Sequence, residues 1–231
     1  EAHRLYANEA AIEHLTAALE LLDGLPADES HLRKRWEVVD NLLRAYWACR
    51  AIERGQEVLQ EYLTLAQRVG YPWGMAAAHH EMVWALAQSH RVAGVADSES
   101  SRRLRQEHLE KCLQIAEAHA LTDWQARART TLARGFMRVE NDWPRAETLL
   151  RETLPAPEGL SKEEVQEIYG WLMLVCAEQG KWDEVAAALR QSTPAGGPRL
   201  LLNVCLGIME DALNRAGRQA EFIAFCEDAR A

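Results

Sequence analysis

The amino-acid sequence predicts an all-α protein, and three observations lead to this prediction. Apolar residues recur with helical periodicity along almost all of the 231 residues. No segment shows the strict alternation of apolar and polar residues that marks a half-buried strand, and no Asn-Gly pair marks a tight hairpin. Turn-forming residues interrupt the pattern so that helices of roughly 12 to 20 residues remain, which is the usual globular range.

The interruptions divide the chain into helices joined by short connections. Each contains glycine, proline, asparagine or aspartate, the residues that favour turns and helix ends. Pro144 and Pro198 suit the first turn of a helix, where the backbone N–H that proline lacks has no intrahelical partner. The interruptions are residues 23–26, 70–72, 121–123, 141–144, 155–157, 180–181 and 195–198.

The segment YGWLMLVCAEQGKWDEV, residues 169–185, shows how two successive helices are arranged. One helix ends at Gly180, and Trp182 with two acidic residues begins the next. This arrangement resembles a degenerate tetratricopeptide repeat (TPR), whose pattern runs W-x2-L-G-x2-Y, then A-x3-F, then P. The matching positions are Tyr169, Leu172, Met173 and Cys176 in the first helix, and Val185 and Leu189 in the second.

The other segments follow the same register. The units are mostly about 37 to 44 residues apart, against about 34 in the standard repeat, and residues 93–101 form an insertion. Since one helix pair cannot bury its apolar face alone, neighbouring pairs must stack. We therefore expect the leucines of one anchor position to be buried at equivalent points between paired helices. The anchor residues are Leu15, Leu59, Leu109, Leu150, Leu189 and Cys226.

The whole chain, residues 1–231, is therefore predicted to be a single TPR-like repeat domain. Its expected architecture is a right-handed superhelical array of antiparallel helix pairs, an α-solenoid. Because the sequence starts at Glu1 without a methionine, we expect it to be a fragment of a larger protein. The array begins with a lone helix over residues 2–24 and continues with pairs at about residues 31–69, 73–119, 122–154, 161–192 and 198–231.

Two further phrases, YLTLAQRVG at residues 62–70 and CLQIAEA at residues 112–118, resemble the helical repeat regions of large bacterial regulators. Those regulators are the MalT-like transcription activators and related ATPase or cyclase proteins. The resemblance covers nearly the whole chain and implies an interaction or sensor module. The sequence has no G-x-x-x-x-G-K-[ST] phosphate loop, so the nucleotide-binding part of such regulators is not visible in it.

The stretch AHHEMVW, residues 78–84, resembles the zinc-protease motif H-E-x-x-H, but Trp84 replaces the second histidine. In the repeat register His80 and Trp84 instead share one face of a first helix on the concave wall of the array. Tryptophan and arginine dominate binding hot spots, so this wall is predicted to bind a partner; packing of Trp84 against the next repeat is the alternative. The predicted groove residues are Glu37, Asp40, Arg44, Trp47, His80, Trp84, Gln88, Thr131 and Arg138.

No arrangement of residues points to catalysis or to a metal. His108, Cys112 and His119 occupy one helix, but a straight helix seldom surrounds an ion, so we expect Cys112 to pack in the core. The five cysteines are far apart in apolar patterns, which indicates reduced thiols rather than disulfides. No serine, histidine and acid triad has local support. The sequence thus predicts no enzyme activity, no catalytic residues, no metal and no cofactor.

The composition excludes two classes of partner. A formal net charge of −9 argues against direct nucleic-acid binding, which clustered lysine and arginine drive. No run approaches the roughly 18 consecutive apolar residues that a membrane span needs, and no secretion signal begins the chain. We therefore expect a cytoplasmic protein that binds neither nucleic acid nor membrane.

These observations predict a non-catalytic protein–protein interaction module whose concave groove binds a peptide or domain, within a multidomain bacterial regulator. The expected partner is a protein or peptide segment, including other domains of the parent chain. Arg44, Arg138 and the aromatic residues would favour a segment with acidic and apolar side chains. The alternative is a small-molecule effector-sensing domain of a transcriptional or signalling regulator, in which a ligand in the same groove changes the curvature of the array.

Overall fold

The computed structural model describes residues 2–93, 98–154, 158–192, 220 and 223. Within these residues every regular element is a helix and none is a strand. The helices cover well over half of the 231 residues, so the prediction of an all-α protein is confirmed for the described part. No helix in these ranges is long and apolar enough to cross a membrane.

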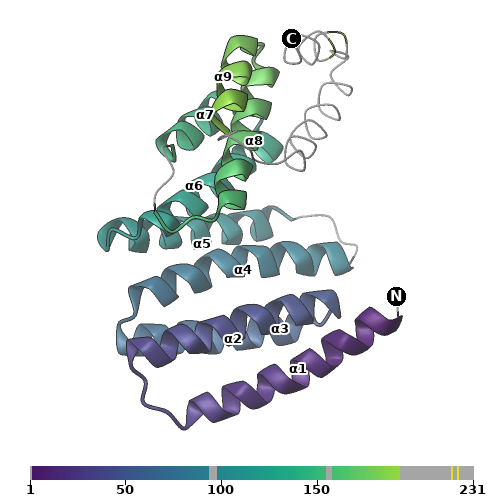
Figure 1. The fold of residues 1–231 in the computed structure, drawn as a ribbon, viewed down its shortest axis with the longest axis vertical. Helices are drawn as coiled ribbons and strands as arrows, with labels where there is room; N and C mark the ends of the chain where they lie inside the picture. The colour runs from purple at the N-terminus through teal and green to yellow at the C-terminus, as the bar shows by residue number, and fades with distance from the viewer. Residues whose placement is uncertain (1, 94–97, 155–157, 193–219, 221–222, 224–231) are drawn as a thin grey trace. The chain divides into compact units, whose positions relative to one another are not determined.

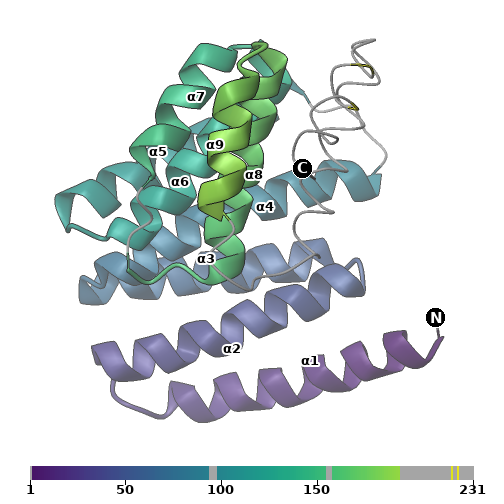
Figure 2. The ribbon, with the colours of Figure 1, turned by 45° about the horizontal axis from the view of Figure 1, so that its top comes forward.

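Helices that follow one another in sequence also pack against one another, from α1 to α5 and again from α7 to α9 (Figure 1 and Figure 2). A short π-helix, Phe136–Glu140, continues α6. The helices are α1 (Ala2–Asp23), α2 (Glu29–Ala48), α3 (Ile52–Val69), α4 (Pro72–Ala93), α5 (Glu99–Ala118), α6 (Thr122–Gly135), α7 (Trp143–Glu152), α8 (Lys162–Glu178) and α9 (Trp182–Ser192).

Local sequence signals set the ends of these helices. Asp28 and Ser98 each accept a hydrogen bond from a backbone N–H in the first turn of the helix that follows. Ser161 and Glu164 form a complete capping box at the start of α8. Gly70 ends α3 in the left-handed conformation, with a φ of 67°, which glycine adopts without steric cost. The helices therefore begin and end within a few residues of the predicted positions.

The chain divides into two compact units, residues 1–128 and 129–231. Each unit has a hydrophobic core of its own. The sequence predicted one continuous array, and the superhelical course of such an array stays a prediction. The fifth predicted pair, residues 198–231, lies outside the described residues except at residues 220 and 223.

The core of the first unit is built around aromatic side chains. The ring centres of Trp36 and Tyr62 lie 4.9 Å apart. Trp73 is edge-on to Trp36 and to Trp124, with ring centres 5.9 and 5.4 Å away. Cys112 is fully buried in the same core, which confirms that it is a packing residue. Side chains from α2, α3, α4, α5 and α6 therefore share one core.

The anchor leucines were predicted to be buried. Leu59 and Leu150 are fully buried and Leu109 is 6% exposed, so the predicted burial is confirmed for these three, while the equivalence of their positions stays a prediction. Leu189 is only half-buried, at the second core, so the prediction is wrong for this residue. Leu15 in α1 is also half-buried.

The second core is formed by α7, α8 and α9 together with the end of α6. Leu150, Val175, Cys176 and Val185 are fully buried in it. Trp143 and Trp182, each at the start of a helix, are half-buried against the same core.

Candidate functional site

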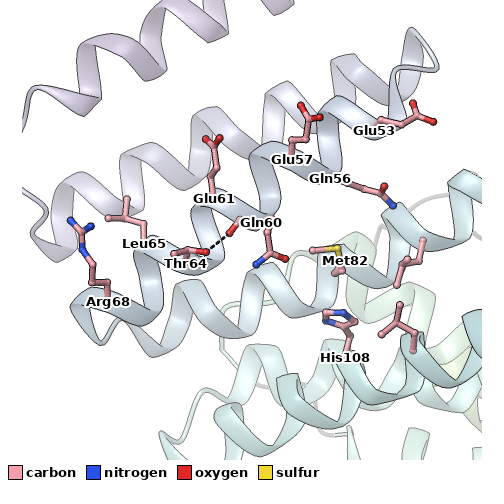
Figure 3. Close-up of a pocket in the computed structure, with 12 residues that line it drawn as sticks. Glu53, Gln56, Glu57, Gln60, Glu61, Thr64, Leu65, Arg68, Met82 and His108 are labelled. Carbon is pink, nitrogen blue, oxygen red and sulfur yellow. Dashed lines mark hydrogen bonds between the residues drawn. The ribbon is translucent and has the colours of Figure 1, made fainter.

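The first unit carries a groove of about 890 Å³ along the outer face of α3 (Figure 3). We call it the α3 groove. One wall is the exposed face of α3, and the remaining lining comes from α4 and α5. The lining residues are Glu53, Gln56, Glu57, Gln60, Glu61, Thr64, Leu65, Arg68, Met82, Leu86, Leu104 and His108.

The sequence of α3 explains why its polar residues form a wall. The apolar residues of the helix recur every three or four positions and are buried, as Leu59 and Leu63 show. The polar residues therefore occupy the opposite face, which solvent reaches. Figure 3 shows the carboxylates of Glu57 and Glu61 at the outer edge of this face, and the amide of Gln60 on the side nearer to α4.

The floor of the α3 groove is apolar. Met82 and Leu86 come from α4, Leu104 from α5 and Leu65 from α3. Leu104 is 41% exposed, which is high for a large apolar side chain, whereas Met82 is only 7% exposed because it also packs in the first core. An apolar floor beside a polar wall suits an amphipathic ligand.

A pair of histidines joins the groove to the first core. Nδ1 of His79 in α4 lies 2.9 Å from Nδ1 of His108 in α5, and His108 lines the groove. Burial, followed by the charges of His108 and Lys111, lowers the pKa of His79 to about 4. Burial also lowers the pKa of His108. Both rings are therefore neutral at neutral pH, and one Nδ1–H donates to the other Nδ1.

The predicted groove residues of α2 do not line the α3 groove. Asp40 and Arg44 form an ion pair within the helix, with 3.0 Å between Oδ2 and Nη2. Burial raises the pKa of Asp40, and Arg44 opposes this effect while the carboxylate of Glu81 adds to it. Trp47 is half-buried against the first core, and Glu37 is exposed.

His80 and Trp84 differ in exposure although they share one face of α4. His80 is 8% exposed and its ring centre lies 5.6 Å from that of Trp124, whereas Trp84 is 38% exposed. Gln88 is half-buried. Trp84 is two residues from Met82, which corresponds to about 200° around a helix, so Trp84 faces away from the α3 groove. The exposed indole that the prediction needs is present, but the imidazole beside it is buried.

The last two predicted groove residues lie in the second unit. Thr131 in α6 is half-buried. Arg138 in the π-helix is exposed, and its guanidinium carbon lies 5.6 Å from the ring centre of Trp171. The nine predicted residues are thus distributed over both units, and the groove that they were expected to form stays a prediction.

The α3 groove was not among the surfaces that the sequence patterns predicted. The available signal was the spacing of Glu53, Glu57 and Glu61, which places three carboxylates one helical turn apart. The repeat register predicted a binding surface on the first helix of each pair, whereas α3 is a second helix. Leu104 was a further signal, because it is an apolar residue between Arg103 and Arg105 in an otherwise polar stretch.

One cluster of possible metal ligands occurs among the residues that the structure describes, and a guanidinium occupies it. The ligand atoms of Glu147, Cys176 and Glu184 lie within 4.8 Å of one another. Arg151 donates hydrogen bonds to Glu147, at 2.8 Å, and to Glu184, and its Nη2 lies 3.9 Å from Sγ of Cys176. The cation that would neutralise the carboxylates is therefore already present. The cluster joins α7 to α8 and α9, and we assign no metal to it.

Replacing Glu147 by glutamine is expected to lower the free energy of unfolding by about 1 kcal/mol at neutral pH. Glu147 is 8% exposed, and its carboxylate accepts hydrogen bonds from Lys181 at 2.6 Å, Arg151 at 2.8 Å and Gln179 at 2.8 Å. Burial alone would raise the pKa of Glu147. The hydrogen bonds outweigh burial and lower the pKa below its ordinary value of 4.5.

The contribution of this carboxylate to stability depends on pH. It is complete above the unfolded-state pKa and is lost as the pH falls through the lower folded-state pKa. The difference in unfolding free energy between wild type and Glu147→Gln should therefore shrink in urea denaturations carried from about pH 7 to about pH 3.5. Glu152→Gln, an exposed position in the same helix, is the control and should show little difference. A difference that does not change with pH would contradict a role for the negative charge.

Comparisons with known proteins concern the fold. No protein-family model matches the sequence, and no curated protein matches it. Among solved structures, the chain is similar to the crystal structure of BtubC (BKLC) from P. vanneervenii, with a TM-score of 0.67 and 16% sequence identity. The match covers 99% of this chain and 89% of that chain. At this identity the likeness shows a shared helical fold and nothing about function.

Proposed function

We propose that this protein is a non-catalytic interaction module that binds a segment of a protein in the α3 groove, either from a partner or from another domain of its own parent chain. The observation that carries the proposal is the groove itself, which combines an apolar floor with a polar wall along one exposed helix. Leu104, 41% exposed on this floor, would be covered by apolar side chains of the bound segment. Removing such surface from water favours binding.

We also propose what kind of protein contains this module, from the sequence patterns. The helix pairs would form a degenerate TPR-like array within a cytoplasmic bacterial regulator of the MalT-like type. The likeness to another helical protein supports a helical architecture and is compatible with such an array. This part of the proposal therefore rests mainly on the repeat register and on the resemblance of residues 62–70 and 112–118 to such regulators.

A small-molecule effector is the second candidate ligand. The volume of the α3 groove, about 890 Å³, falls within the range of about 300 to 1,000 Å³ that small-molecule sites have. Most lining side chains of α3 are exposed, however, so a small ligand would keep much of its surface in water. A protein segment that extends along α3 uses the same surface more fully.

The proposal is tested with a displayed library of random peptides selected against the immobilised protein. Selected peptides are synthesised, and their affinities are measured by fluorescence anisotropy. Leu104→Glu is expected to weaken binding about ten-fold or more, since it puts a charge on the apolar floor of an interface. Leu21→Glu introduces the same change at a leucine of α1 that is 78% exposed, and it should leave the affinity unchanged.

A third variant, Trp84→Ala, separates the α3 groove from the surface that the sequence predicted. If the peptides bind the α3 groove, this variant binds as wild type does. If Trp84→Ala costs about 2 kcal/mol, the usual threshold of a hot spot, while Leu104→Glu has no effect, the site is the wall of the first helices and the α3 groove is excluded. Peptides that depend on neither position would contradict the proposed function.

A further inference from the structure

We propose that the α3 groove accepts a basic amphipathic helix of a partner protein, with leucine or methionine on one face and lysine or arginine beside them. This inference rests on the proposed function and specifies the chemistry of its ligand. It differs from the acidic and apolar segment that the sequence led us to expect, because the groove lies on a different surface. Three features of the groove support it: the charge of the wall, the chemistry of the floor, and the order of charges along α3.

The wall of the groove is acidic. Glu53, Glu57 and Glu61 follow one another at intervals of four residues, which is about one helical turn. Only Glu57 is in an ion pair, with Arg54 at 3.0 Å, and both of these side chains are more than half exposed. Neither Glu53 nor Glu61 forms an ion pair with any residue that the structure describes. A partner helix that lies along α3 with lysine or arginine at every fourth position would pair with all three carboxylates.

The floor of the groove favours a helix over an extended peptide. It consists of side chains from three helices, with Leu65, Met82, Leu86 and Leu104 as its apolar part. The backbone N–H and C=O groups of these helices bond within the helices, so an extended segment would leave its own backbone groups unpaired over apolar carbon. A helix satisfies its backbone internally and offers only side chains to the floor. The 18 residues of α3 provide room for a partner helix of about five turns.

The charges along α3 also define a direction. Arg68 lines the groove at the end of α3 opposite to Glu53. Figure 3 shows these two side chains at opposite ends of the view, with Glu57 and Glu61 between them. The bound helix is therefore expected to place its basic residues along Glu53, Glu57 and Glu61, and an acidic or polar residue near Arg68.

The experiment uses three synthetic, fluorescein-labelled peptides and the full chain. The first is a helix with a leucine face and lysine at every fourth position, the second has glutamate in place of lysine, and the third has the composition of the first in scrambled order. By fluorescence anisotropy the first peptide should bind, and the other two should bind at least about ten-fold more weakly. Raising the salt concentration from about 0.05 M to about 0.5 M should weaken the binding of the first peptide, because salt screens exposed ion pairs.

The matched variants are two triple substitutions with the same change in net charge. The first triple variant combines Glu53→Gln, Glu57→Gln and Glu61→Gln. It should bind the lysine peptide about ten-fold more weakly, and most of the salt dependence of this binding should be lost. The second triple variant combines Glu9→Gln, Glu13→Gln and Glu20→Gln, all at exposed positions of α1. It should bind the lysine peptide with the affinity of the wild type. Equal binding of the lysine and glutamate peptides, or equal effects of the two triple variants, would overturn the inference.

These outcomes are distinguishable from a failure of the proposed function. If library-selected peptides lose binding with Leu104→Glu but are acidic or extended, the groove is a protein-binding site and only the basic helix is wrong. If Leu104→Glu affects no peptide at all, the proposed function fails together with the inference.

Discussion

Replacing Leu150 by alanine is expected to lower the free energy of unfolding by about 2 to 5 kcal/mol, the largest effect that we predict for a single substitution. Leu150 is fully buried, and it packs in the second core together with Val175, Cys176 and Val185. Helices α7, α8 and α9 all contribute to this core, so the space left by the missing side chain cannot be filled by moving one residue alone. The loss combines the transfer free energy of the removed carbons with the cost of the remaining cavity.

Urea denaturation followed by circular dichroism measures the effect of Leu150→Ala. Leu21→Ala is the control, because Leu21 is 78% exposed and alanine is a good helix former, so its unfolding free energy should change by less than about 0.5 kcal/mol. If Leu150→Ala is as stable as wild type, Leu150 does not pack in the second core.

Replacing Gly74 by alanine is expected to lower the free energy of unfolding by about 1 to 3 kcal/mol, although the same change usually stabilises a helix. A Cβ at position 74 would lie 2.5 Å from Oη of Tyr62 and 2.5 Å from Cδ1 of Tyr71. Both tyrosines are at most 4% exposed, so neither ring can move aside without disturbing the first core. The strain of this overpacking exceeds the gain in helix propensity.

Gly135→Ala is the matched control for Gly74→Ala. Gly135 has an ordinary helical conformation, with φ −62° and ψ −50°, and no atom lies within 4 Å of an added Cβ. This substitution should therefore be neutral or stabilising by up to about 1 kcal/mol. Thermal and urea denaturation of both variants check the prediction. It is wrong if Gly74→Ala matches or exceeds Gly135→Ala in stability.

The helices could be predicted because their signals are local. Asp28, Ser98 and Ser161 cap helices with hydrogen bonds to residues three positions further along the chain. Gly70 ends α3 through its own backbone conformation. The burial of the anchor residues Leu59, Leu109 and Leu150 could also be predicted, because a periodic apolar position on an amphipathic helix faces the core. How completely a neighbouring helix covers it is not a local property, and Leu189 is only half-buried.

The candidate site could be predicted only in part. Trp84 is exposed as the predicted groove requires, but His80, one turn earlier on the same face, is buried near Trp124. His80 and Trp124 are more than 40 positions apart in the sequence, so periodicity could not indicate that their rings lie close together. The α3 groove was missed for a related reason, since the spacing of Glu53, Glu57 and Glu61 predicts an exposed face but not the apolar floor beside it.

The sequence by itself determined that the described part of the chain is helical, where most of its helices begin and end, and which face of an amphipathic helix such as α3 is apolar. Those properties depend on backbone conformation and on side chains within one or two turns of each other. The tertiary structure alone decided that His79 meets His108, that Arg151 fills the space between Glu147, Cys176 and Glu184, and that α3, α4 and α5 line an open groove. Each of these arrangements needs side chains from different helices within a few ångströms, and such distances depend on how the helices pack, which no local pattern specifies.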